Sequence, residues 1–268
     1  MINDGIVHLY NDLAWLWPLW GDPMTNYADW CNRITQLIQR FSRRDAQTLL
    51  NLGCGGGKNI FTLKHKFEVT GVDISPAMLD LAKQLNPECN FLLGDMRNCS
   101  LGQEFDAVLV DDAISYMVSH AELSAVFQNA YRHLRVGGVM IVEPDYTKDT
   151  FEQNRTRVSY ANAKCKPANV DVTFIENNFD PDPGNNTFED TIIYLIREKG
   201  KLRIEKDISE FGLFTRDEWR AALCEVGYEV REEACTVEQN SRMFVCVKIK
   251  QKYYRAHANS TVPNAGST

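Results

Sequence analysis

The sequence predicts an α/β protein built mainly on a parallel sheet, with antiparallel strands inserted late in the chain. From Thr48 to Val142, short apolar runs alternate with longer amphipathic ones, which is the pattern of repeated strand-helix-strand units. After Pro144 the pattern changes to apolar strands joined by turn residues. The 268 residues suit one compact domain that carries such an insertion.

Five strands are expected in the parallel region, and the apolar runs that predict them lie at 48–52, 69–72, 91–93, 105–110 and 139–142. A helix follows the first strand and runs to about Lys66. In the next helix, Ser75 can cap the amino end while Pro76 occupies the first helical position. An amphipathic segment at 121–134 predicts another helix, and Gly137 and Gly138 predict the turn after it.

The insertion is expected to contain antiparallel strands at 170–174, 191–196 and 202–208. Thr215 and Glu218 then have the spacing of a capping box, and Gly227 can end the helix that they begin. Two final strands are expected at about 229–233 and 243–249.

These patterns divide the chain into three parts. An aromatic N-terminal helical cap occupies residues 1–45, and the main domain occupies 46–250, with the insertion at about 145–212. The polar tail at 251–268 is expected to be disordered, because it has few apolar residues to bury.

Composition argues against several classes of partner. The net charge of -7 gives no electrostatic reason to expect nucleic acid. The first ten residues lack the basic and apolar pattern of a signal peptide, and the apolar runs are too short to span a membrane. The eight cysteines form no CxxC pair, which favours reduced thiols and a cytoplasmic protein.

A glycine-rich bend at 53–57 lies between the first strand and its helix, where glycines permit a sharp turn and the close approach of a ligand. Asp73 ends the second strand 20 residues after Gly53, the separation at which a carboxylate reaches a ribose hydroxyl. The dinucleotide fingerprint read from Gly53 and Gly55 fails, because its third glycine is replaced by Lys58. A nucleotide-type ligand is therefore expected, and NAD(P) is the weaker candidate.

Several motifs together resemble the class I S-adenosylmethionine-dependent methyltransferases, and they read LLNLGCGGG, GVDIS, LLGDM, FDAVLV and LRVGGVMIV. The resemblance covers roughly Thr48 to Glu143 and the C-terminal hairpin. It implies a Rossmann-like, seven-stranded methyltransferase sheet with an antiparallel strand insertion after the fifth strand. The insertion resembles that of the small-molecule branch, including sugar-amine and glycine N-methyltransferases, in which extra strands roof the acceptor pocket.

The resemblance also implies a set of cofactor-binding residues. The glycine bend would lie against the methionine part of S-adenosylmethionine, and its residues are Gly53, Cys54, Gly55 and Gly57. Asp73 would bind the ribose, Asp95 would accept from the adenine amine, and Ile74 and Met96 would sandwich the ring. Asn51 stands where family members commonly have Glu or Asp, so it keeps hydrogen bonding without the charge.

Asp111 and Asp112 end the fourth strand, at the carboxyl edge where open α/β sheets bind ligands. Their backbone carbonyls and that of Ala113 are expected to receive the cofactor ammonium. Tyr116 is expected to face the acceptor. His120 can remove a proton from the acceptor, although a histidine at this position more often caps a helix.

The stretch before the first strand is unusually aromatic, with Tyr10, Trp15, Trp17, Trp20, Tyr27 and Trp30. It is either a lid over the cofactor, with Tyr27 or Tyr10 hydrogen-bonded to the cofactor carboxylate, or an aromatic helix packed on the sheet edge. Acidic residues at Glu176, Asp180 and Asp182 either give the pocket a negative field or are solvated turn residues.

The sequence therefore predicts methyl transfer from S-adenosylmethionine to a small-molecule amine or hydroxyl by in-line displacement, without a metal ion. Alignment and exclusion of water are the main requirements of such a transfer, so a general base is optional. A homodimer is possible. The alternatives are a non-catalytic S-adenosylmethionine-binding protein and, less favoured, an NAD(P)-linked oxidoreductase.

Overall fold

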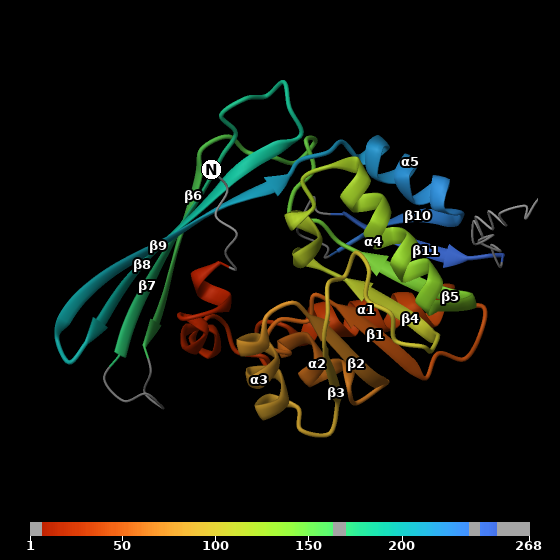
Figure 1. Ribbon diagram of the computed structural model, residues 1–268, viewed down its shortest axis with the longest axis horizontal. Coiled ribbons are helices and arrows are strands. Elements are labelled where there is room, and N and C mark those ends of the chain that lie inside the picture. Colours follow the sequence, from red (N-terminus) through yellow and green to blue (C-terminus); the bar gives the residue numbers. More distant parts are fainter. Residues whose placement is uncertain (1–6, 163–169, 236–241, 251–268) are drawn as a thin grey trace, which may run out of the picture.

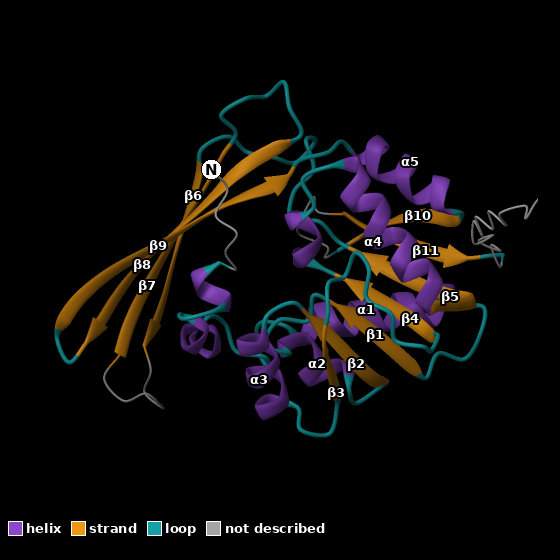
Figure 2. Cartoon of the chain, viewed as in Figure 1, coloured by secondary structure: helices purple, strands orange, loops and turns teal. Residues whose placement is uncertain are grey.

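The protein contains two sheets with clearly different roles (Figure 1). The computed structural model describes residues 7–162, 170–235 and 242–250. The predicted tail at 251–268 lies outside the described residues. Figure 2 shows a helix-covered sheet beside a long, strongly twisted sheet that carries no helix along most of its length.

The larger sheet has seven strands in the order β10-β11-β5-β4-β1-β2-β3. Its parallel strands are β1 (Thr48–Leu52), β2 (Glu68–Asp73), β3 (Asn90–Leu93), β4 (Phe105–Val110) and β5 (Leu134–Val142). The strands β10 (Tyr228–Ala234) and β11 (Arg242–Lys248) form an antiparallel hairpin, and β11 pairs antiparallel with β5. The predicted seven-stranded α/β fold is confirmed.

Helices cover both faces of this sheet. One face packs against α4 (His120–His133) and α5 (Arg216–Val226) through an apolar cluster that includes Phe127 and Trp219. The other packs against α1 (Ala28–Phe41), α2 (Lys58–Leu63) and α3 (Pro76–Leu85). The strands β1, β4 and β5 are buried on both faces, and their sequences are therefore nearly continuous apolar runs.

The predicted helix signals are present in the structure. The Ser75 hydroxyl accepts from the Met78 amide at the start of α3, with Pro76 as its first residue. Thr215 and Glu218 form the reciprocal capping box of α5, and Gly227 ends that helix in the left-handed region.

One predicted turn is wrong. Gly137 and Gly138 lie inside β5, which begins at Leu134, directly after α4. Gly137 adopts a φ of +84°, and the register of β5 against β4 shifts between Phe105 and Ala107. The two glycines therefore mark an irregularity within the strand. Glycine occurs both at such irregularities and in turns, and the sequence alone does not distinguish the two.

The smaller sheet has the antiparallel order β6-β7-β8-β9, and its strands are β6 (Arg155–Asn162), β7 (Val170–Phe179), β8 (Thr187–Glu198) and β9 (Lys201–Gly212). The three predicted strands of the insertion are confirmed, and each is longer than expected. The strand β6 was missed, because its polar sequence, with two arginines and an asparagine, shows little apolar alternation.

The aromatic N-terminal stretch lies between the two sheets (Figure 1). Two short 3-10 helices, η1 (His8–Tyr10) and η2 (Ala14–Leu19), pack on the concave side of the smaller sheet. The ring of Trp20 lies 4.6 Å from that of Phe174 on β7. One space is therefore enclosed by three parts of the fold: the carboxyl edge of the larger sheet, the two 3-10 helices and the smaller sheet.

Candidate active site

The glycine bend and the acid at the end of β2 are in direct contact. The Gly55 amide donates to one carboxylate oxygen of Asp73 at 2.7 Å, and the Ser75 amide donates to the other at 2.9 Å. Gly53 has a φ of +75°, and a Cβ there would lie 2.4 Å from the Cβ of Ala113, so only glycine fits. The carboxylate therefore lies beside the bend, in the arrangement that the sequence spacing predicts.

Burial raises the pKa of Asp73, while hydrogen bonds from the Ser75 and Gly55 amides act in the opposite direction. Each oxygen of a carboxylate has two acceptor sites, and the two amides use one on each. Asp73 thus keeps acceptor capacity toward the cavity that it lines.

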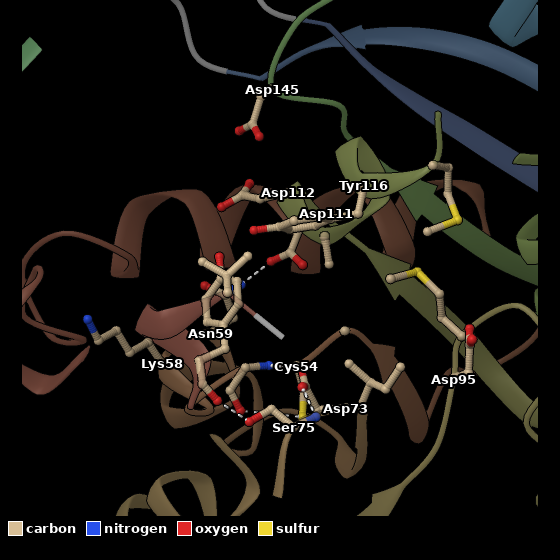
Figure 3. A pocket seen from close by; sticks show the side chains of 18 of the residues that line it. Cys54, Lys58, Asn59, Asp73, Ser75, Asp95, Asp111, Asp112, Tyr116 and Asp145 are labelled. Carbon is tan, nitrogen blue, oxygen red and sulfur yellow. Dashed lines mark hydrogen bonds between the residues drawn. The ribbon is translucent and has the colours of Figure 1, made fainter. Parts of the chain in front are cut away.

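A cavity of about 500 Å³ opens above the bend, and we call it the glycine-bend cavity (Figure 3). Twelve of the predicted site residues line it: Tyr27, Gly53, Cys54, Gly55, Asp73, Ile74, Asp95, Met96, Asp111, Asp112, Ala113 and Tyr116. Eleven of them come from the ends of β1 to β4 and from the segments that follow these strands, and Tyr27 directly precedes α1. The sequence therefore grouped most of the cavity wall before the fold was known.

Three predicted site residues do not line the glycine-bend cavity. Asn51 is fully buried in β1, and its carboxamide has no hydrogen-bond partner among the described residues. The carbonyl of Gly57 accepts from the Asn86 side chain, so this glycine serves the contact between α2 and α3. His120 is exposed, and its Nε2 lies 3.2 Å from a Glu218 oxygen at the start of α5. Binding or catalytic roles for these three stay predictions.

One end of the glycine-bend cavity combines apolar side chains with a carboxylate. Ile74 and Met96 line it from the segments after β2 and β3, and Ile74 is 57% exposed although it is apolar. The carboxylate of Asp95 is held by the Arg97 guanidinium at 2.6 Å. Arg97 also pairs with Glu122 of α4 at 2.8 Å, which fixes the carboxylate in place.

The opposite end is strongly acidic. Figure 3 shows Asp111, Asp112 and Asp145 one above another across the cavity from Asp73. Burial and then repulsion by Asp112 raise the pKa of Asp111, whose carboxylate accepts from the Asn59 side chain. Burial and then repulsion by Glu143 raise the pKa of Asp112 to about 6. The fold therefore gathers negative charge where a cationic group would be bound.

The N-terminal segment closes the glycine-bend cavity from the other side. The indole of Trp17 lies on the bend so closely that a Cβ at Gly56 would come within 2.4 Å of its ring. The buried ammonium of Lys58 donates to the Trp17 carbonyl at 2.7 Å and also to the carbonyl of Trp20. Burial lowers the pKa of Lys58 to about 8. The lysine that breaks the dinucleotide fingerprint therefore fastens the segment 17–20 to α2.

A second cavity of about 610 Å³ lies between the N-terminal segment and the concave side of the smaller sheet, and we call it the sheet-side cavity. The two cavities share wall residues, which are Val7, Tyr10, Trp17, Tyr27, Asp112, Tyr116, Asp145 and Phe211. The rings of Tyr10 and Tyr116 are 6.1 Å apart at this boundary, and Phe211 of β9 packs 4.6 Å from Tyr116. A molecule in one cavity can therefore meet a molecule in the other.

Comparison with known proteins identifies the chemistry. A family model described as a methyltransferase domain matches residues 49–138. The chain is 28% identical over 226 residues to dTDP-4-amino-2,3,4,6-tetradeoxy-D-glucose N,N-dimethyltransferase of Saccharopolyspora spinosa, covering 82% of this chain and 87% of that protein.

Solved structures agree with the sequence match. The sugar N-methyltransferase KedS8 from Streptoalloteichus sp ATCC 53650 is similar with a TM-score of 0.77 and 25% identity, over 93% of this chain and 96% of that one. The amino pentose methyltransferase CalS10 from Micromonospora echinaspora, with S-adenosylmethionine bound, has a TM-score of 0.72 and 25% identity, over 88% and 96%.

The chain is an S-adenosylmethionine-dependent methyltransferase with a Rossmann-like fold. The predicted class, its cofactor and its action on a small molecule are confirmed. These matches do not support the oxidoreductase alternative. Lys58, the residue that breaks the dinucleotide fingerprint, instead holds the N-terminal segment through its side chain.

The cavity of this methyltransferase fits S-adenosylmethionine on its own geometry. The volume falls in the range of small-ligand pockets. Asp73 has acceptor capacity for ribose hydroxyls, Ile74 and Met96 offer apolar surfaces for the adenine, and the acidic end suits the cationic amino acid part. The described residues contain no cluster of side chains that could hold a metal ion, and no described helix is long and apolar enough to cross a membrane.

Several wall residues were not predicted, and most carried little signal. Asn59 and Arg97 follow the recognised motifs by only a few residues, so proximity to those motifs could have indicated them. Phe211 and Arg157 come from the inserted strands, more than 90 residues after the glycine bend. Only the path of the insertion brings them to the cavities.

Proposed function

We propose that this methyltransferase transfers a methyl group to the amine of a small molecule. The observation that supports an amine most is the boundary between the two cavities, where Asp112 and Asp145 meet the rings of Tyr10 and Tyr116. Carboxylates and aromatic faces together attract an ammonium group. The relatives named above are N-methyltransferases, which favours nitrogen over oxygen as the acceptor.

The predicted cofactor residues keep their proposed roles. Asp73 would hold the ribose, Asp95 the adenine amine, and the glycine bend the methionine part, with the Asp111–Ala113 backbone near the ammonium. Bound S-adenosylmethionine supplies the electrophilic methyl group and its own leaving group. The remaining work of the protein is to orient the acceptor and exclude water.

An ammonium acceptor must lose a proton before its nitrogen can attack, and we propose Asp112 as the group that receives it. Its pKa of about 6 makes it a better base near neutral pH than an ordinary aspartate. Tyr116 lines both cavities and would orient the amine. Burial raises the pKa of Tyr116, so its hydroxyl stays protonated.

We propose that the N-terminal segment acts as a lid over the cofactor, as one of the two sequence hypotheses states. Trp17 covers the glycine bend, and Lys58 fastens the backbone of this segment. Replacing Lys58 with Met is expected to raise the KM for the cofactor about tenfold, because the lid loses its anchor. Lys64→Met on the same helix region, whose ammonium pairs with exposed Glu88, is the control. Equal KM values in both variants would remove the lid from the proposal.

Transfer itself is tested with radiolabelled S-adenosylmethionine against parallel panels of small amines and phenols. Labelled amines support the proposal, and labelling confined to phenols would overturn it. Binding of S-adenosylhomocysteine without labelling of any acceptor would instead favour the non-catalytic cofactor-binding alternative.

We propose that the protein forms a homodimer through the convex side of the smaller sheet. Exposed apolar side chains gather there on β6 and β9, and they are Val158, Tyr160, Leu202, Ile204 and Ile208, each at least 47% exposed. Patches of this kind mark interaction sites, and a two-fold axis lets one such face cover its own copy. Light scattering of an Ile204→Lys, Ile208→Lys double variant should show a monomer if this face is the interface.

We also propose a cytoplasmic protein that acts on small molecules and does not bind nucleic acid. The seven cysteines in the described part of the chain are free, as expected in a reducing compartment. The net charge of -7 is unfavourable for a polyanion. Retention on immobilised DNA at low salt would contradict this part of the proposal.

A further inference from the structure

The sheet-side cavity contains four acidic side chains in a wall that is otherwise mostly apolar and aromatic. Asp112 and Asp145 reach it from the edge of the larger sheet, whereas Glu176 and Asp190 reach it from β7 and β8 of the smaller one. Repulsion by Glu176 is one of the smaller causes that raise the pKa values of Asp112 and Asp145, so the acids from the two sheets share one electrostatic environment. The acids of the two sheets therefore line one cavity.

Among the described residues that line this cavity, Arg157 of β6 is the one basic side chain. Its guanidinium lies 2.6 Å from a carboxylate oxygen of Glu176 and 5.7 Å from the centre of the Tyr146 ring. Its positive charge is therefore already neutralised by a neighbour, and its flat face is also in contact. The cavity offers a diphosphate no unpaired cation from these residues.

Size does not restrict the acceptor to a small molecule without a nucleotide, since about 610 Å³ admits either. Charge does. Protein sites for diphosphates use several arginines or lysines or the amino end of a helix. In this cavity a diphosphate would face four acidic side chains while the one guanidinium is already paired with Glu176, so it would lose its hydration without compensation.

We propose that the acceptor is a compact cationic amine that carries no phosphate, such as a free amino sugar, and that Glu176 determines this preference. The inference rests on the proposed amine methylation and departs from the relatives whose printed names specify dTDP-sugars. Glu176 acts through its ion pair: it occupies the guanidinium of Arg157, which would otherwise bind a phosphate and repel the ammonium.

Aromatic side chains support the same ligand. Tyr10, Trp17, Trp20 and Phe174 line the cavity, so a compact ring can stack while its ammonium reaches the boundary with the glycine-bend cavity. Asp190 is buried and accepts from the Asn178 side chain at 2.7 Å. Burial raises the pKa of Asp190 to about 7, so this carboxyl carries only part of a negative charge near neutral pH. The amine would thereby point toward Asp112, and through it toward the transferable methyl group.

The test compares matched ligands on the full chain saturated with S-adenosylhomocysteine. Calorimetry measures the binding of glucosamine, glucosamine 6-phosphate and UDP-glucosamine, which share one amine and differ in phosphate. We expect glucosamine to bind at least tenfold more tightly than either phosphorylated ligand. Equal or tighter binding of a phosphorylated ligand, or no binding of glucosamine, would overturn the inference.

Two variants assign the preference to its residue. Glu176→Gln should weaken glucosamine binding severalfold and strengthen UDP-glucosamine binding, because Arg157 is released. Glu189→Gln removes an exposed carboxylate from the convex side of the same sheet and should change neither affinity. Identical behaviour of the two variants would remove Glu176 from the proposal.

The outcomes separate this inference from the proposed function. Methyl transfer to a nucleotide-linked amine at a rate above that of the free amine would leave amine methylation intact and overturn only the phosphate-free acceptor. Transfer confined to phenols would overturn amine methylation itself. Binding of S-adenosylhomocysteine, measured first, shows in either case that the protein is folded and competent.

Discussion

The two ends of β4 carry aspartates in opposite electrostatic settings. Asp106, at the amino end, pairs with Arg44 at 2.8 Å and Arg135 at 2.9 Å and accepts two amides from the start of β1. Burial opposes its ionisation, but the hydrogen bonds from Arg135, Gln47 and Thr48 prevail and lower the pKa of Asp106 to about 2. Asp111 directly follows the last residue of β4, and burial and then repulsion by Asp112 raise its pKa.

The difference separates stability from function on one strand. A paired aspartate at the amino end holds β1, β4 and β5 together, so its ionised state favours folding. The clustered acids at the carboxyl end repel one another and oppose folding when they ionise. Such groups persist at a site that uses their charge, which is why the carboxyl edge holds the cavities.

The largest effect is expected at the carboxyl edge, from Asp73→Ala. The ribose would lose a charge-assisted acceptor, so binding of S-adenosylhomocysteine should weaken about 100-fold, or about 2.7 kcal/mol. Calorimetry measures the affinity, and Asp73→Asn, which keeps the shape, should retain part of it. Undiminished affinity of Asp73→Ala would refute the ribose assignment.

At the amino end, Asp106→Asn should lower the free energy of unfolding by about 2 kcal/mol at pH 7 and leave cofactor affinity unchanged. The folded-state pKa of about 2 lies below the ordinary 3.8, so the unfolded chain binds more protons between these values. The stabilisation is therefore present above pH 4 and is lost as the pH falls through 2. Urea titrations of both proteins across this range check it, and a constant difference at all pH values would contradict the ion-pair explanation.

Asp112→Asn should act with the opposite sign. The folded-state pKa of Asp112 is raised to about 6, so the folded chain binds more protons between pH 4 and 6 and loses stability as the pH rises. Because this side chain contacts solvent in the cavity, the variant should gain only about 1 kcal/mol above pH 6, and nothing below pH 4. Amine methylation should fall about tenfold. If the variant were less stable than the wild type at pH 7, the acids at this edge would not be destabilising one another by repulsion.

The smallest effect is expected from His120→Asn. The imidazole is exposed, pairs with Glu218 and lines neither cavity, so methyl transfer should change less than about twofold and stability by less than about 0.5 kcal/mol. Initial-rate measurements against Tyr116→Phe make the comparison. A tenfold loss of kcat in His120→Asn would restore it as the candidate base.

Local patterns determined much of the fold and part of the site. Apolar runs located the parallel strands, and the caps of α3 and α5 followed from Ser75 and Thr215, because these signals depend on residues close in sequence. The 20-residue spacing of Gly53 and Asp73 was informative for a related reason: adjacent parallel strands bring their carboxyl ends together. The predictions failed where a residue has more than one structural use, as with Gly137 in β5.

By itself, the sequence determined the class of protein, its cofactor and the edge of the sheet where chemistry takes place. Only the tertiary structure decided what faces that edge. The packing of η1 and η2 against the smaller sheet brings Tyr10 to Tyr116, and the path of β6 and β7 brings Arg157 to Glu176. Local sequence patterns do not encode such contacts, because they join elements that are distant in sequence and meet only when the whole chain packs.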